Sequence, residues 1–226
     1  MNDMSPAAPR RTYSGIAASE RAVARRQRFI AAGIELFGSI GYHATTMRTL
    51  TAATGLTNRY FYESFATMEE LLMACYEKLM DDYRARLNQV LYEADDGLEL
   101  RCRAGLRCFF EAMADPCFAR ITHIEVLGVS PRVDDLYIRS TNEFAALMMG
   151  FLDQAGVPLA AHDPRQMEIV GSALAGAVIH TGALWVRSRY ATPVEVVVEA
   201  ALKVILGTVS QLRVEPAGPG ARLSRT

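Results

Sequence analysis

The segment Thr45–Phe65, TTMRTLTAATGLTNRYFYESF, decides the fold of the N-terminal third of this 226-residue chain. A threonine pair opens a short helical pattern made by Met47, Leu50 and Ala53. The chain then turns at Gly55 and restarts at Thr57, and Phe61 and Phe65 share one helix face four residues apart. A helix, a tight glycine turn and a short second helix are the layout of a helix-turn-helix, which places its second helix in the DNA major groove.

The charge distribution supports a nucleic-acid partner at this end of the chain. Residues 1–66 contain eight Arg and four acidic residues, a net charge of +4, so the remainder carries −5 because the total is −1. A basic module on an acidic body is expected when only one end of a protein meets phosphate. The alternative is a basic face that is merely solvated.

Apolar residues at helical spacing predict an all-α fold of about nine helices without a convincing strand. The first helix is expected from residue 19, with Gly38 and Gly41 ending it. The remaining helices are expected at 46–53, 57–64, 67–93, 96–114, 116–128, 131–155, 164–188 and 193–212. Four pairs of an N-cap residue with proline at the first helical position mark helix starts: Asp115-Pro116, Ser130-Pro131, Asp163-Pro164 and Thr192-Pro193. Thr192 and Glu195 also have the spacing of a capping box.

These patterns divide the chain into four parts. Residues 1–18 lack a period and are expected to be a disordered basic arm. Residues 19–66 are expected to form the helix-turn-helix domain, and residues 67–213 are expected to form a separate helical body. Residues 214–226 are rich in Pro and Gly and are expected to be a disordered tail.

A cytoplasmic location is expected, because the N-terminus has no apolar signal run. The four cysteines form no CxxC pair and are interpreted as reduced thiols. Residues 169–186 are uncharged but contain three glycines, Ser172, His180 and Thr181. We interpret this run as a core helix that also forms a subunit interface, and not as a membrane span.

Enzymatic function is not expected. The sequence has no GxSxG, P-loop, GxGxxG or HExxH motif, and its four histidines are scattered without metal-ligand spacing. We therefore predict no catalytic residue, no metal site and no cofactor.

The N-terminal third resembles the DNA-binding domain of the tetracycline-repressor (TetR) family of bacterial transcription regulators. The matching residues are Thr45-Thr46, Gly55-Leu56-Thr57, Phe61-Tyr62 and Phe65, preceded by the helix Arg28–Phe37 and by Gly38–Gly41. The resemblance implies a homodimer that reads a palindromic operator and an inducer pocket in the body. It also implies a four-helix dimer bundle from helices 164–188 and 193–212, in which Ala173, Gly176, Ala177 and Ala183 would permit close helix approach.

The candidate DNA contacts lie on and beside the second helix of the motif. Asn can pair with an adenine edge and Arg with guanine, whereas hydroxyl and other Arg groups suit phosphate. The resemblance assigns Tyr62 to phosphate. It also reveals two departures: Arg59 replaces a residue that is often small, and Met68 replaces a common lysine. The candidates are Arg25, Arg26, Thr46, Arg48, Thr57, Asn58, Arg59, Tyr60 and Tyr62.

The candidate ligand pocket combines apolar side chains with a few polar ones. Aromatic and methionine side chains suit an adaptable apolar site, although the same stripe also suits ordinary core. The candidates are Leu106, Phe109, Phe110, Met113, His123, Tyr137, Thr141, Phe144, Met148 and His180.

The sequence thus predicts a transcription regulator that acts as a repressor. It binds double-stranded DNA and is released by a small, largely apolar effector. The alternative keeps the DNA-binding module but gives the body a protein partner or a purely structural role.

Overall fold

The computed structural model describes residues 11–94 and 97–214, and all regular structure within them is helical. The all-α prediction is therefore confirmed. The α-helices are α1 (Arg11–Ser39), α2 (Met47–Thr54), α3 (Asn58–Tyr62), α4 (Met68–Glu93), α5 (Leu98–Met113), α6 (Pro116–Arg120), α7 (Pro131–Gln154), α8 (Pro164–Arg187) and α9 (Val194–Leu212). A π-helical turn, η1 (Ile121–Glu125), and a 3₁₀ turn, η2 (Leu159–Ala161), complete the set.

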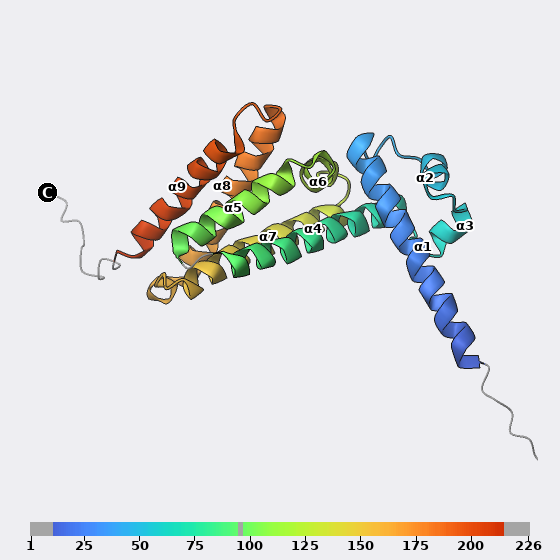
Figure 1. Ribbon diagram of the computed structural model, residues 1–226, viewed down its shortest axis with the longest axis horizontal. Helices are drawn as coiled ribbons and strands as arrows, with labels where there is room; N and C mark the ends of the chain where they lie inside the picture. Colours follow the sequence, from blue (N-terminus) through green and yellow to red (C-terminus); the bar gives the residue numbers. More distant parts are fainter. Residues whose placement is uncertain (1–10, 95–96, 215–226) are drawn as a thin grey trace, which may run out of the picture.

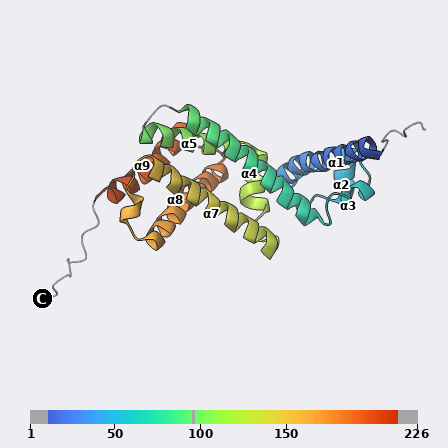
Figure 2. The ribbon, with the colours of Figure 1, turned by 90° about the horizontal axis from the view of Figure 1, so that it is seen from below.

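The molecule has a head at one end and a body at the other. Helices α1, α2 and α3 form the head, and α4 extends from it into the body (Figures 1 and 2). Within the body, α5 packs against α9 and α7 packs against α8. The chain therefore places its basic segment and the rest of its helices at opposite ends.

Two helix boundaries differ from the sequence prediction. Helix α1 begins at Arg11, so the prediction of a disordered arm over residues 1–18 is wrong for residues 11–18. Residues 10–39 contain no proline, so nothing stops the helix from extending toward the N-terminus as far as Arg11. The helix expected over 116–128 is α6 followed by the π-helical turn η1. Residues 1–10 and 215–226, expected to be disordered, lie outside the described residues.

Three of the four predicted proline-marked caps are confirmed. Asp115 accepts from the amide of Cys117 at 2.8 Å, and Asp163 accepts from that of Gln166 at 3.0 Å. Ser130 accepts from the amide of Val133 at 3.3 Å. Each bond satisfies an amide that has no partner inside its helix.

The fourth cap, at Thr192, is wrong. The N-cap of α9 is Pro193, which has no side-chain capping bond. The carbonyl of Thr192 instead accepts from the indole Nε1 of Trp185 at 2.7 Å, and Glu195 pairs with Arg107 at 3.4 Å. The Glu195 carboxylate, which the local pattern assigned to a capping box, thus pairs with Arg107 of α5 instead.

The core of the head does not end where the head ends in sequence. Phe29, Phe37 and Phe61 are fully buried there, together with Leu71 of α4. The same cluster continues into η1 and the start of α7 through Ile121, Val126, Val133 and Leu136. A separate cluster fills the body and contains the buried residues of α5, α8 and α9. The expected domain boundary after residue 66 thus falls inside one continuous core.

Two glycines allow the head to approach the body closely. A Cβ added at Gly38 would lie 2.9 Å from the Cα of Cys117. Gly41 has φ +94° and faces the side chains of Arg120 and Glu125. The segment that closes α1 therefore packs directly on α6 and η1.

The first prediction concerns this contact. Gly41→Ala should lower the free energy of unfolding by about 1–3 kcal/mol, because it forces a left-handed backbone on alanine and displaces the Arg120–Glu125 pair. Gly150→Ala, in open space on α7, should instead raise stability by about 0.5–1 kcal/mol. Thermal or urea unfolding of both variants checks this, and an unchanged Gly41→Ala would contradict the packing described.

Candidate functional site

The short helix α3 is fixed by the geometry of α2. Thr46 and Thr49 form a capping box at the start of α2: the Thr46 hydroxyl accepts from the Thr49 amide at 3.2 Å, and the Thr49 hydroxyl from the Thr46 amide at 3.0 Å. Gly55 ends the helix with φ +64° and donates its amide to the carbonyl of Thr51 at 2.9 Å. Both ends of α2 are thus set by local hydrogen bonds, and the chain leaves Gly55 in the direction of α3.

Aromatic packing sets the rotation of α3. Phe61 is fully buried and meets Phe29 of α1 edge to face, with ring centroids 5.5 Å apart. The ring of Phe65 lies 5.8 Å from that of Phe61. With these rings inward, the opposite face is free: the Arg59 side chain is 86% exposed and Tyr62 is 63% exposed. Asn58 is also exposed.

Charged contacts hold this face in place. Glu63 pairs with Nε of Arg59 at 3.0 Å and with Arg25 at 3.5 Å. The Arg25 guanidinium lies 4.5 Å from the ring centroid of Tyr60, and that of Arg26 lies 4.8 Å from the ring of Phe65. Arg25 is therefore a half-buried group that helps to position α3. Arg59 is held by a single exposed ion pair, which contributes no more than about 1 kcal/mol.

Arg28 was not among the sequence candidates, yet it joins two elements of the motif. Its guanidinium donates to the carbonyl of Thr54, the last residue of α2. This contact satisfies a carbonyl at a helix C-terminus and ties α1 to the turn before α3. No local pattern signals it, because the partners lie 26 residues apart.

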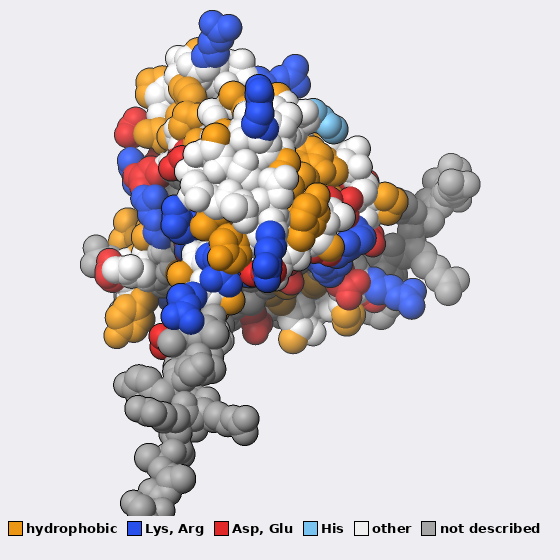
Figure 3. Space-filling model, turned by 90° about the vertical axis from the view of Figure 1, so that its right-hand side faces the viewer, with side chains coloured by type: hydrophobic (Ala, Val, Ile, Leu, Met, Phe, Trp, Pro, Cys, Tyr) orange, Lys and Arg blue, Asp and Glu red, His pale blue; other side chains and the backbone are white. Residues whose placement is uncertain are grey.

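The remaining candidates lie on the same end of the molecule. Thr46, Arg48 and Thr57 are all exposed. Thr57 occupies the N-cap position of α3, but its side chain makes no capping bond, so its hydroxyl is not committed to the helix. Figure 3 shows this end, where blue Lys and Arg side chains, with red acidic ones among them, lie around a largely uncharged surface. The arrangement suits phosphate contacts around a polar, base-reading helix.

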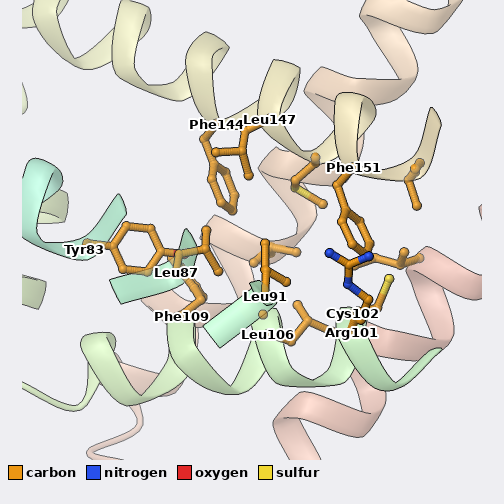
Figure 4. A pocket seen from close by; sticks show the side chains of 15 residues that line it. Tyr83, Leu87, Leu91, Arg101, Cys102, Leu106, Phe109, Phe144, Leu147 and Phe151 are labelled. Atoms are coloured by element: carbon orange, nitrogen blue, oxygen red, sulfur yellow. The ribbon is translucent and has the colours of Figure 1, made fainter. Parts of the chain in front are cut away.

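An apolar pocket lies inside the body between α4, α5 and α7 (Figure 4). Four predicted residues line it: Leu106, Phe109, Phe144 and Met148. The sequence candidates omitted the contribution of α4, namely Tyr83, Leu87 and Leu91, and also Arg101. The free volume of the pocket is about 60 Å³. Its lining is apolar except for the polar groups of Tyr83 and Arg101.

A second, more polar chamber adjoins this pocket and shares Tyr83, Phe109 and Phe144 with it. Three further predicted residues line this chamber: His123, Tyr137 and Thr141. The Thr122 hydroxyl lies 2.6 Å from Nδ1 of His123. Burial lowers the pKa of His123 to about 4, so this imidazole is neutral at pH 7 and can offer a ligand one donor or acceptor.

Three predicted lining residues lie outside both chambers, and those assignments are corrected. Phe110 and Met113 are fully buried in the body core, where Phe110 packs edge to face on Trp185. Both side chains face α8, whereas the opposite side of α5 lines the pocket. His180 is exposed on the outer face of α8. Helical spacing alone does not tell which apolar face of α5 meets a cavity.

A polar contact connects the body to the head beside the second chamber. Glu125, at the end of η1, accepts the amide of Tyr42 at 2.7 Å. The same carboxylate accepts from Nε of Arg120 at 2.7 Å, and Arg120 also donates to the carbonyl of Ser39. Because His123 lies on the same π-helical turn, a change in the chamber is one turn away from the loop that precedes α2.

Comparison with known proteins agrees with this geometry. Residues 29–75 match the family model described as bacterial regulatory proteins, tetR family. The HTH-type transcriptional activator FasR of Mycolicibacterium smegmatis is 29% identical over 87 residues, which cover 38% of this chain. That match spans 39% of FasR, so it leaves most of the curated relative unmatched.

Solved structures share the fold over most of the chain. The fatty acid degradation regulator FadR of Bacillus halodurans has a TM-score of 0.69 at 17% identity, covering 81% of this chain and 95% of its own. FadR of Bacillus subtilis in complex with stearoyl-CoA has a TM-score of 0.68 at 15% identity, covering 79% and 96%. A TetR-family regulator of Pectobacterium atrosepticum has a TM-score of 0.64 at 20% identity, covering 87% and 98%. At these identities the likeness shows the fold alone.

Proposed function

Because the chain belongs to the TetR family of bacterial regulatory proteins, we propose that it is a cytoplasmic repressor that binds a palindromic operator as a homodimer. A small, largely apolar effector in the body releases it from DNA. The observation that carries this proposal is the exposed face of α3, held rigidly against a core that continues into the effector-binding body. The alternative, a body that binds a protein partner or is only structural, remains an outcome of the test below.

The exposed face of α3 divides its residues between two kinds of contact. Arg59 is released for base reading once its surface pair with Glu63 opens, and its planar fork matches the two acceptors of guanine. Asn58 and Tyr60 flank it. Tyr62, Thr46, Arg48 and Thr57 lie where hydroxyl and guanidinium groups would position the protein on phosphate. Arg25 and Arg26 lie against aromatic rings and support the helix from behind, with phosphate contact as their second role.

The second prediction separates these roles. Arg59→Ala should weaken operator binding by about 1–3 kcal/mol and relax preference at one base pair in each half-site. Tyr62→Phe should cause a smaller loss that is equal for operator and random DNA, because it removes only a phosphate hydrogen bond. Titration of both variants on operator and scrambled DNA measures this. Equal losses on both DNAs for Arg59→Ala would make Arg59 another phosphate contact.

The dimer interface is proposed on the outer faces of α8 and α9. Ile169 and Leu184 of α8 and Val196 and Val204 of α9 are exposed by 49–70%. A shallow groove between the two helices is lined by Ala177, Thr181, Ala200 and Val204, among others. Helix α8 has the length and composition of a membrane span, yet only 33% of its most apolar window is buried within one chain. A second copy of the same face covers such a surface in a two-fold dimer.

The third prediction tests this interface. A Cβ at Gly176, on the exposed face of α8, meets no atom within 4 Å in the single chain. Gly176→Arg should therefore leave the fold of each protomer intact but separate the dimer and reduce operator affinity. Gly150→Arg, equally open on α7, is the matched control and should stay dimeric. Sedimentation at micromolar concentration measures the oligomeric state of both variants. A dimeric Gly176→Arg protein would place the interface elsewhere.

The effector is proposed to be of the fatty-acyl type. The pocket is apolar, and among the proteins of this fold, FadR is named for fatty acid degradation and one FadR was solved with stearoyl-CoA. The free volume of about 60 Å³ is far below the about 300–1,000 Å³ of pockets that hold drug-sized ligands. An acyl chain must therefore move lining side chains such as Met148 and Phe144. That requirement links binding to a change in the shape of the body.

Two routes carry such a change to the head. Helix α4 runs through both cores, with Leu71 in the head cluster and Leu87 in the pocket wall. The turn η1 carries His123 in the second chamber and Glu125 on the Tyr42 amide. Either movement alters the placement of α3 and hence the spacing of the two recognition helices in a dimer.

The fourth prediction is the test of the function as a whole. Binding-site selection with the purified protein should yield a palindrome, and dodecanoyl-CoA or dodecanoate should release the protein from it. The coupling should be about 1–3 kcal/mol and reciprocal, so that operator weakens effector binding by the same factor. Selection of a palindrome without release by any acyl ligand would favour the body as a partner-binding or structural domain.

A further inference from the structure

We propose that Arg101 binds the negatively charged end of the effector, while the apolar part of the ligand extends from Arg101 toward Tyr83. This inference rests on the proposed function and specifies the chemistry of its ligand. It concerns a residue on α5 that the sequence did not single out.

Among the described residues that line the apolar pocket, Arg101 alone carries a charged side chain. Figure 4 shows it beside Phe151 and Cys102, at the opposite end of the pocket from Tyr83. Its guanidinium carbon lies 5.2 Å from the ring centroid of Phe151. Between the two ends, the wall consists of Leu87, Leu91, Leu106 and Leu147 among other apolar groups. The pocket is thus an apolar passage with a cation at one end.

The hydrogen bonding of Arg101 is incomplete. Its Nε is buried and has no hydrogen-bond partner within the described part of the chain. A buried donor without an acceptor is unfavourable, and it gains most when a ligand supplies the acceptor. The aromatic ring of Phe151 supports the flat guanidinium without competing for its N–H groups.

Neighbouring arginines on α5 show what a structural arginine looks like here. Arg103 pairs with Glu99 at 2.7 Å and also with Glu199. Arg107 pairs with Glu195 at 3.4 Å. No ion pair joins Arg101 to a carboxylate of the described residues. Among the described residues, Arg101 therefore differs from its neighbours both in facing the pocket and in having no acidic partner.

An oxyanion is the group that Arg101 fits. The guanidinium presents N–H donors in a fixed plane that matches two oxygens of one carboxylate or phosphate. A fatty acid supplies a carboxylate at the end of its chain, and a coenzyme A thioester supplies phosphates beyond its acyl group. A fatty alcohol has the same apolar chain but no negative charge.

The experiment compares these ligands on the full-length protein. Titration calorimetry measures binding of dodecanoate, dodecanoyl-CoA and dodecanol to the unaltered protein, to Arg101→Gln and to Arg103→Gln. The unaltered protein should bind one of the two anions at least about tenfold more tightly than dodecanol. Arg101→Gln should lower the affinity for that anion to the level of the alcohol and leave dodecanol binding unchanged. Arg103→Gln, on the same helix but in a surface pair, should keep the preference.

The preferred anion identifies the source of the charge, carboxylate or coenzyme A phosphate. Equal binding of all three ligands, or an Arg101→Gln protein that keeps the preference, overturns the role of Arg101 while the acyl effector stands. Binding of none of the three overturns the acyl effector and this assignment together. Circular dichroism and operator binding report whether Arg101→Gln is folded. If it is not, Arg101→Lys, which keeps the charge but loses the planar fork and the Nε donor, should still weaken anion binding more than alcohol binding.

Discussion

The apolar core beneath α3 is the interaction on which the rest of the structure depends. Phe61 packs edge to face on Phe29, and this contact fixes which face of α3 is left exposed. The same core takes in Leu71 of α4 and Ile121 of η1, both fully buried. Because close-packed side chains transmit displacement instead of absorbing it, a shift in the body is transmitted through this core to α3.

Polar contacts at the edge of that core fix the orientation of the head relative to the body. Glu125 is held by Arg120 and accepts the Tyr42 amide, so a carboxylate from the body fixes the backbone just before α2. Gly41 is required there, since a side chain would collide with both partners. Helix α4 is one connection between the head and the body, and η1 is a second one. Two attachments restrict the head more than a single helical link would.

The body has a different physical character, because its apolar pocket has a free volume of only about 60 Å³. Tyr83 and Phe144 form a wall shared by the apolar pocket and the polar chamber. Burial raises the pKa of the Tyr83 hydroxyl above its usual value, and this hydroxyl lacks a partner within the described residues. Under the proposed function, a ligand that enters must move lining side chains and gains most if it satisfies such groups. The proposed effector would then act as a switch, since an empty and a filled body differ in packing.

The sequence by itself determined the features that depend on near neighbours. The helix-turn-helix followed from Gly55 and the Phe61–Phe65 spacing, and three caps followed from a polar residue placed before proline, because these signals act within one turn. Tertiary structure alone decided the rest. It paired Arg28 with Thr54, turned Phe110 toward the core and Arg101 toward the pocket, and gave the Thr192 carbonyl to Trp185. Those contacts depend on which helix packs against each face. Helical periodicity shows which residues share a face but not which helix that face packs against.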